Sequence, residues 1–232
     1  MEIKTVGVVG AGTMGNGIAH VFAKSGYRVI LVDVEQRFLN RALETIGKNL
    51  EREVAKNKIT AEERGAALGR IEATVTRPAL SRCDFLVEAA TEKLEIKAEL
   101  FRDLDRICRP EIILASNTSS ISITRLAALT QRPQQVIGMH FFNPVPMMKL
   151  VEVIRGLATS QEAFTTVMEL SRKLDKTPVE VNDAPGFVAN RVLMPMLNEA
   201  MYAVMEGIAT PEAVDEVFKL GMAHPMGPLT LA

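Results

Sequence analysis

The segment TVGVVGAGTMGNGIAHVFAKSGYRVILVD, residues 5–33, decides the fold. Its opening apolar run predicts a buried strand, which leads directly into the glycine-rich turn Gly10–Gly15. An apolar-periodic stretch from about Met14 to Lys24 predicts a helix closed by Gly26, and residues 28–32 predict a second buried strand. Strand, turn, helix and strand in this order are typical of a parallel α/β sheet.

The turn has the pattern G-x-G-x-x-G. Gly10 permits the tight turn, Gly12 lets the backbone approach a pyrophosphate, and Gly15 permits close packing of helix on strand. The helix N-terminus supplies unpaired N–H groups to the anion. Asp33 ends the second strand about 20 residues later, where an acid binds the adenosine ribose and repels a 2′-phosphate. The segment therefore favours NAD over NADP, and a flavin stays open at this point.

Beyond Asp33, strand-like and helical segments alternate, which predicts an α/β fold: a Rossmann-like, doubly wound, mostly parallel sheet. Val34 to about Lys56 is long, charged and helical in pattern, and it predicts a helical hairpin insertion together with residues 60–68. Further strands are expected at 71–75, 85–88, 112–115, 136–139, 149–154 and 179–181, and further helices at 92–107 and 161–174.

The turn cluster Asn182–Gly186 marks a change of pattern. We expect residues 1–183 to form an NAD-binding domain and residues 184–232 to begin an all-helical C-terminal domain. The last residues, 227–232, resemble the start of another apolar helix, so we expect this second domain to be truncated in the sequence.

Composition narrows the class of protein. The 232 residues are 47% hydrophobic and 24% charged, as in globular enzymes, and the net charge of −1 argues against nucleic acid as a partner. The two cysteines, Cys83 and Cys108, have neither metal-ligand nor disulfide spacing, which predicts no metal site and a reducing compartment. No signal peptide and no membrane-spanning run is apparent, so a cytoplasmic location without a membrane partner is expected.

The stretch GMHFFNPVPMMKLVEV, residues 138–153, carries the chemistry. Glu152 lies among apolar residues and would be costly to bury alone, and His140 is the natural partner. A carboxylate fixes the tautomer of an imidazole and raises its basicity, as a general base requires. Alternatively, Glu152 faces water on an edge strand and His140 merely fills a turn.

The other histidines are weaker candidates. His20 lies within the first helix, in a packing or surface position, and His224 precedes Pro225 in a loop. His140 follows a buried strand at the edge where open parallel sheets bind ligands. His140 is therefore the best candidate for the base.

Two polar groups have open roles. Ser116–Ser120 follows a buried strand and either lines a nicotinamide pocket or caps a short helix. Asn190 lies early in a helix among apolar neighbours and is either a satisfied core amide or a side chain facing a cleft.

The chain resembles the short-chain L-3-hydroxyacyl-CoA dehydrogenases over essentially its whole length, and most of all their bacterial 3-hydroxybutyryl-CoA branch. The motifs that carry the resemblance are VGVVGAGTMGNGIA, SNTSSISIT, GMHFFNPVPMMKLVEV, DAPGFVANRVLMPMLNEA and LGMAHPMGPLTL. It implies NAD-dependent oxidation of (S)-3-hydroxyacyl-CoA, with acyl-CoA as substrate and a homodimer as the assembly. Family members continue with further helices after the last motif, so dimerisation of this sequence is in question.

The resemblance also implies roles for individual residues. The catalytic group falls on Ser119, His140, Glu152 and Asn190. NAD contacts fall on the glycine loop (Gly10, Gly12, Thr13, Met14 and Gly15) and on Asp33, Glu92, Lys97, Asn117, Ser119 and Asn143. The substrate contacts Ser119 and Asn190, and the coenzyme A phosphates are expected on the hairpin at Asn49, Arg52 and Lys56, although these three also fit an ordinary solvated face.

Two rival functions stay open on the sequence. One is a sugar-acid dehydrogenase of the same superfamily, such as one acting on gulonate. The other is a non-catalytic NAD-binding protein on the same scaffold, since a fold alone does not establish an activity.

Overall fold

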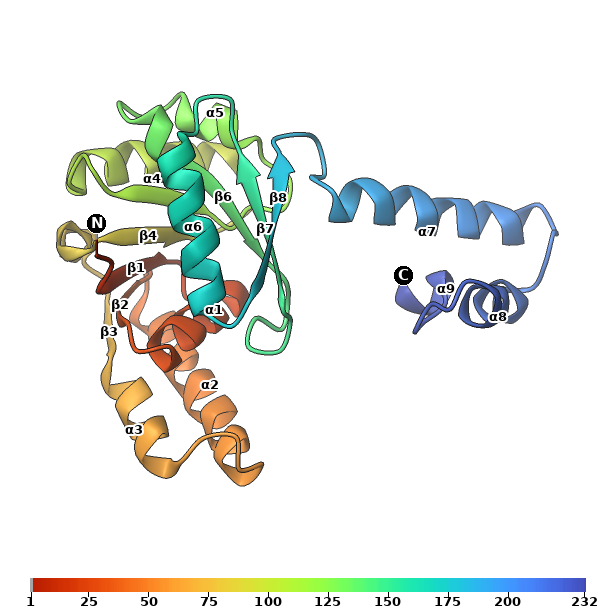
Figure 1. The fold of residues 1–232 in the computed structure, drawn as a ribbon, viewed down its shortest axis with the longest axis horizontal. Helices are drawn as coiled ribbons and strands as arrows, with labels where there is room; N and C mark the ends of the chain where they lie inside the picture. Colours follow the sequence, from red (N-terminus) through yellow and green to blue (C-terminus); the bar gives the residue numbers. More distant parts are fainter. Residues whose placement is uncertain (1) are drawn as a thin grey trace. The chain divides into compact units, whose positions relative to one another are not determined.

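A computed structural model describes residues 2–232 (Figure 1). The chain divides into two compact units, the first extending to Ala184 and the second comprising Pro185–Ala232.

The first unit is built on one sheet with the strand order β3-β2-β1-β4-β5-β6-β7-β8. All strands from β3 to β6 in this order run parallel, as the alternating sequence predicts. The strands are β1 (Thr5–Val9), β2 (Arg28–Val32), β3 (Ile71–Thr74), β4 (Phe85–Glu88), β5 (Ile113–Ser116), β6 (Val136–Phe141), β7 (Leu150–Arg155) and β8 (Thr177–Asn182).

Strand β7 reverses the direction of the sheet. It pairs antiparallel with β6, and β8 then pairs parallel with β7. A parallel pair needs a long crossover connection, whereas residues 142–149 join β6 to β7 directly. The mostly parallel sheet is thus confirmed, with a reversed pair at one edge.

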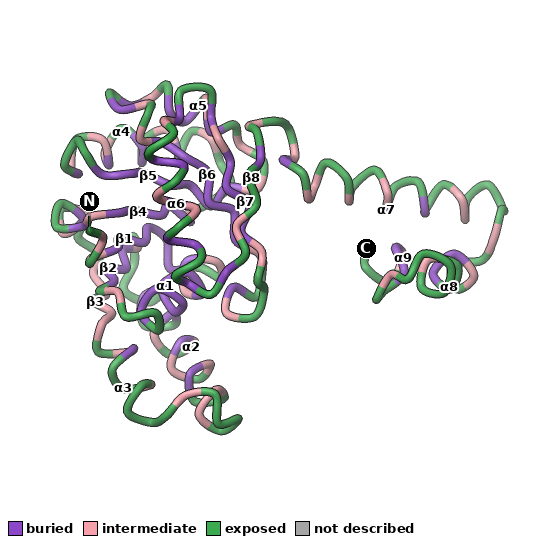
Figure 2. Tube along the Cα trace, in the orientation of Figure 1, coloured by how far each residue is buried: buried purple, intermediate pink, exposed green. Residues whose placement is uncertain are grey.

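Helices cover the sheet and bury its apolar strands. Figure 2 shows the central strands as the most buried part of the chain, and β1, β4, β5 and β6 are buried over nearly their whole length. The predicted hairpin insertion is present as α2 and α3, which pack on each other. The elements are α1 (Thr13–Lys24), α2 (Gln36–Ala55), α3 (Ala61–Gly69), α4 (Leu94–Ile107), α5 (Ile123–Ala127) and α6 (Gln161–Lys173), with short 3₁₀ turns at Arg77–Arg82 and Pro133–Gln135.

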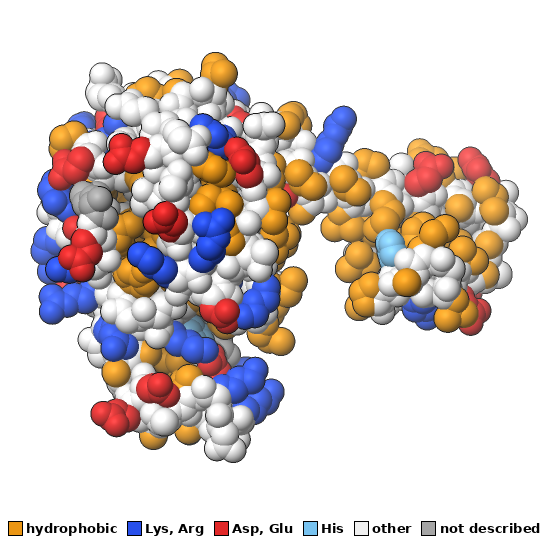
Figure 3. Space-filling view, in the orientation of Figure 1, with side chains coloured by type: hydrophobic (Ala, Val, Ile, Leu, Met, Phe, Trp, Pro, Cys, Tyr) orange, Lys and Arg blue, Asp and Glu red, His pale blue; other side chains and the backbone are white. Residues whose placement is uncertain are grey.

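The second unit is helical, with α7 (Ala189–Met205), α8 (Pro211–Gly221) and α9 (Pro228–Leu231). Asp215 on α8 accepts hydrogen bonds from the backbone N–H groups of Leu229 (2.8 Å) and Thr230 (2.9 Å), and so caps α9. A Cβ atom at Gly227 would lie 2.2 Å from the carboxyl carbon of Asp215, so this cap requires glycine there. Figure 3 shows hydrophobic side chains gathered on the surface of this unit.

Candidate active site

The imidazole of His140 and the carboxylate of Glu152 form a buried pair. The antiparallel register places the two residues directly opposite each other on β6 and β7. His140 Nδ1 lies 2.8 Å from Glu152 Oε2, and the two residues are only 7% and 2% exposed. Because a carboxylate can only accept here, Nδ1 of the imidazole carries a proton and donates to Glu152.

The end of β6 is held on its other side by Asn117. Pairing of β5 with β6 stops at Ser116 and Gly138, two residues before His140. The side chain of Asn117 continues the contact, because its Oδ1 accepts a 2.9 Å hydrogen bond from the backbone N–H of Phe141. The ring of Phe142 lies 4.6 Å from the imidazole of His140, centroid to centroid. His140 and Phe141 are therefore held from the strands on both sides of β6.

The loop that carries Ser119 is shaped by Glu92. Its carboxylate accepts hydrogen bonds from the Ser119 backbone N–H (2.7 Å), the Ser119 hydroxyl (3.3 Å) and the Thr118 hydroxyl (2.7 Å). The sequence left open whether Ser116–Ser120 caps a short helix. The residue at the N-cap of α5 is instead Ser122, just after this stretch. Ser119 is half-buried in this loop, at the carboxyl end of β5.

Glu88 and Lys97 form a second buried pair beneath that edge of the sheet. Lys97 Nζ lies 2.7 and 2.8 Å from the two carboxylate oxygens of Glu88, and both side chains are at most 1% exposed. Glu88 also accepts from the Ser116 hydroxyl and from the Ala90 N–H, each at 2.7 Å. Lys97 is thus ion-paired inside the protein, beneath residues such as Ala90 that border the glycine loop.

The glycine loop is shaped to receive a pyrophosphate. Gly10 has φ +100°, and a Cβ atom on Gly15 would lie 1.8 Å from the Gly10 carbonyl oxygen, so helix and turn pack in contact. A Cβ on Gly12 would meet open space instead, and no side chain caps the N-terminus of α1. The exposed backbone at Gly12 and the uncapped helix end leave donors available to an anion.

Asp33 borders a cavity beside this loop. Its carboxylate accepts hydrogen bonds from the N–H groups of Ala11 (2.6 Å) and Val34 (2.7 Å), which fixes it between the turn and the end of β2. The cavity, of about 570 Å³, is lined by Asp33, by Thr13 and Met14, and by Arg77, together with mainly apolar residues. Its size, carboxylate and apolar walls suit the adenosine part of a dinucleotide.

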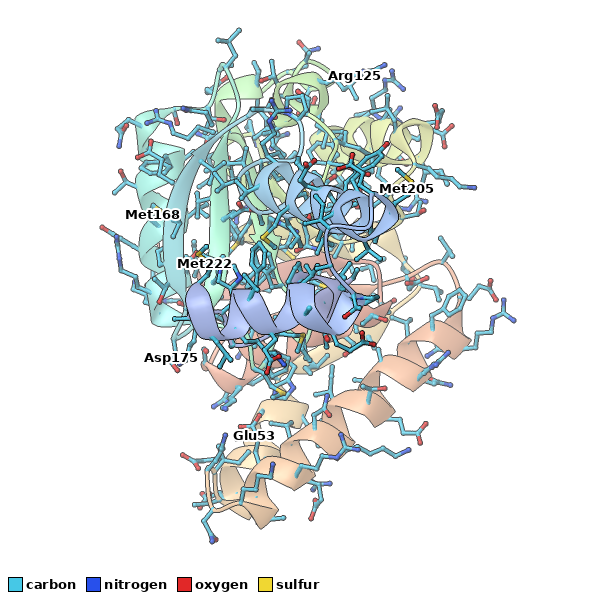
Figure 4. All side chains as sticks on the ribbon, turned by 90° about the vertical axis from the view of Figure 1, so that its right-hand side faces the viewer. Glu53, Arg125, Met168, Asp175, Met205 and Met222 are labelled. Carbon is cyan, nitrogen blue, oxygen red and sulfur yellow. The ribbon has the colours of Figure 1, made fainter. Side chains whose placement is uncertain are left out.

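Two further cavities follow α2. One, of about 440 Å³, lies between the glycine loop, α2 and residues 143–146, and Asn143 is among its lining residues. The other, of about 470 Å³, is lined by Arg52 and Lys56 with the further cations Lys24, Lys58 and Lys149 and the acids Glu53 and Asp175, which Figure 4 labels. Asn49 lines both cavities, so they adjoin each other along the helix. This arrangement brings together the three predicted hairpin contacts.

The remaining candidates belong to other elements. Asn190 belongs to α7 of the second unit. His224 lies between α8 and α9 of the same unit, and its ring packs edge-on against Phe218 at 5.3 Å. His20 is 1% exposed inside α1, and burial lowers its pKa to about 4 despite the nearby carboxylate of Glu53. Within residues 2–232, no cluster of His, Cys, Asp and Glu side chains has the geometry of a metal site, and no helix is both long and apolar enough to traverse a bilayer.

The sequence did not predict three features of this region. These are the ion pair of Lys97 with Glu88, the hydrogen bond from the Phe141 N–H to Asn117, and the reversed direction of β7. The short, helix-free connection at residues 142–149 was the available signal for the reversal.

Comparison with known proteins gives matches over nearly the whole of this chain. Residues 5–184 match the NAD-binding domain of the 3-hydroxyacyl-CoA dehydrogenases, and residues 186–232 match the C-terminal domain of the same family. The chain is 56% identical to a probable 3-hydroxybutyryl-CoA dehydrogenase of Bacillus subtilis, over 100% of this chain and 81% of that protein. A 3-hydroxybutyryl-CoA dehydrogenase of Bradyrhizobium diazoefficiens is 51% identical, over 99% of this chain and 78% of that protein.

A solved structure agrees with this. The crystal structure of (S)-3-hydroxybutyryl-CoA dehydrogenase from Ralstonia eutropha superposes with a TM-score of 0.98 at 48% identity, over 100% of this chain and 82% of that one.

Proposed function

Because the chain belongs to the 3-hydroxyacyl-CoA dehydrogenase family, we propose that it oxidises (S)-3-hydroxybutyryl-CoA to acetoacetyl-CoA with NAD, and catalyses the reverse reduction. The observation that carries this proposal is the buried pair of His140 and Glu152 on adjoining strands. A histidine with Nδ1 engaged by a carboxylate is suited to remove a proton from an alcohol.

The proposed chemistry at His140 follows from its tautomer. In the oxidation direction, His140 Nε2 accepts the proton of the substrate 3-hydroxyl while the hydride leaves C3. Glu152 stabilises the imidazolium that results, because its carboxylate lies 2.8 Å from Nδ1. In the reduction direction, the imidazolium returns that proton to the oxygen at C3.

The residues of the glycine loop fit NAD. We assign the pyrophosphate to the open backbone at Gly12 and the N-terminus of α1, and the adenosine ribose to Asp33. When bound, NAD supplies the nicotinamide that accepts the hydride. Of the remaining predicted NAD contacts, Asn143 lines the cavity beside the glycine loop. Ser119 would approach the nicotinamide from the loop that Glu92 holds, while Asn117 and Lys97 make contacts within the protein.

The substrate contacts are proposed from the same geometry. Ser119 lies in a loop fixed by Glu92 and would donate to the substrate oxygen at C3. For Asn190 on α7, the substrate contact is proposed from the family resemblance alone. The basic cavity at Arg52 and Lys56 would hold the coenzyme A phosphates. Asn49, shared by both cavities along α2, would lie beside the pantetheine arm that joins the two ends of the substrate.

A steady-state assay tests the proposal. Acetoacetyl-CoA should be reduced with NADH and far less well with NADPH, and gulonate should not be oxidised with NAD. His140→Ala should lose about 10²–10⁴-fold in turnover while still binding NADH in a fluorescence titration. The matched variant His224→Ala removes an imidazole from the second unit and should keep turnover near that of the unmodified protein. Near-normal turnover by His140→Ala would refute the assignment of the base.

The assembly and the location are also proposals. We infer that residues 184–232 belong to a helical dimerisation domain, because α7 and α8 expose Met194, Met201, Met205 and Leu220, each more than half exposed. Such a surface favours a homodimer partner, which light scattering of the purified chain would detect. A cytoplasmic location is supported by Cys83 and Cys108, which are both free thiols.

A further inference from the structure

The loop between β6 and β7 forms walls of both cavities along α2. This loop, residues 142–149, is called here the proline loop. Asn143, Pro144 and Val145 line the cavity that opens onto the glycine loop. Pro144, Met147 and Lys149 line the basic cavity. The position of the proline loop therefore sets the width of both spaces in which NAD and acyl-CoA are proposed to bind.

The ammonium of Lys176 holds this loop from beneath. Lys176 lies just before β8 and next to Asp175, which Figure 4 labels. Its side chain is buried, at 7% exposure, and Nζ donates to the backbone carbonyls of Val145 (2.5 Å) and Met148 (2.8 Å). Burial lowers the pKa of this ammonium, so the protein bears a desolvation cost to keep a charge at this place.

Packing on the opposite side leaves the loop little freedom. Val145 is 1% exposed and lies against Gly17 of α1, where a Cβ atom would come within 2.8 Å of the Val145 Cβ. Where the loop meets β7, the backbone N–H of Thr177 donates to the Lys149 carbonyl at 2.7 Å. The proline loop is thus clamped between α1 and Lys176.

We propose that Lys176 is a positioning residue for ligand binding, which holds the proline loop at the distance from α1 and α2 that NAD and acyl-CoA require. An apolar side chain of equal length would fill the same volume, but it would leave two carbonyls without their charged donor. The pair of His140 and Glu152 is held separately by the β6–β7 ladder. Loss of the clamp should therefore weaken binding more than it slows the chemical step. This inference rests on the function proposed above.

The test compares Lys176→Met with Lys176→Arg and with Lys173→Met, which removes an exposed lysine of the neighbouring α6. In Lys176→Met, we expect KM for acetoacetyl-CoA and Kd for NADH to rise about tenfold, with kcat within about threefold of normal, the pattern of lost uniform binding. Lys176→Arg should restore most of the binding, and Lys173→Met should change neither constant.

A second variant displaces the loop from its other face. Gly17→Ala adds a methyl group towards Val145 and should raise the same constants with Lys176 intact. It also covers the case in which Lys176→Met does not fold.

The proposal is overturned if folded Lys176→Met keeps KM and Kd near normal, or if kcat falls while binding is unchanged. If Lys176→Met does not fold, near-normal KM and Kd in Gly17→Ala overturn it. Absence of turnover in the unmodified protein would refute the proposed function instead. The NADH titration would then still decide the role of Lys176.

Discussion

Replacing Glu88 by glutamine should strongly destabilise the first unit. The change removes one charge from an ion pair whose side chains are 1% and 0% exposed, and it leaves the Lys97 ammonium without a counter-charge. Breaking a buried pair in this way costs about 3–5 kcal/mol. In a domain of this size, 1 kcal/mol lowers the melting temperature by about 2–4 °C, so a decrease of about 6–20 °C is expected.

The loss is measured by thermal and urea unfolding followed by circular dichroism. Lys97→Met alone should be destabilising as well. The double variant Glu88→Gln/Lys97→Met should lose at least about 2 kcal/mol less than the sum of the two single losses, because neither charge is then left unpaired. Glu72→Gln is the matched control. It breaks an exposed pair with Arg82, whose side chains are 51% and 56% exposed, and it should leave the midpoint nearly unchanged. A loss below about 1 kcal/mol for Glu88→Gln, or strict additivity in the double variant, would refute this reasoning.

Three other perturbations probe the site. Glu152→Gln should keep NADH binding and lower turnover, since the proposed imidazolium loses the adjacent negative charge 2.8 Å away. An unchanged rate would mean that the pair is structural. Asp33→Ser should raise kcat/KM for NADPH relative to NADH, because Arg77 lines the same cavity and can meet a 2′-phosphate. Adding Arg77→Ala should cancel that gain. His20→Leu should flatten the acid dependence of stability, because the pKa of His20 falls from 6.5 to about 4 on burial, so the unfolded chain binds the proton first. As the pH drops from 6.5 to 4, the unmodified protein should lose about 3 kcal/mol more than the variant in urea titrations, and equal slopes would contradict the prediction.

The sequence predicted what depends on local pattern. The glycine turn and Asp33 could be placed because their spacing follows from the geometry of one βαβ unit. The pairing of His140 with Glu152 could be anticipated because a carboxylate among apolar residues needs a partner nearby.

Long-range partners could not be predicted in this way. Lys97 is one polar residue on an amphipathic helix, and nothing local shows that it lies beneath β4 against Glu88. The contacts of Lys176 are equally hard to predict, because its acceptors are main-chain carbonyls, which every residue carries. Three-dimensional packing decides such contacts, and a single sequence does not record it.

The reversed strand β7 has a consequence for how such an enzyme can diversify. His140 and Glu152 lie on paired strands, so their spacing is set by main-chain bonding and does not depend on the identity of residues 142–149. With the proposed roles of these residues and cavities, mutations in that loop or on α2 can change which acyl chain is accepted while the proton-transfer geometry stays the same. Chemistry and selectivity can evolve here as separate traits.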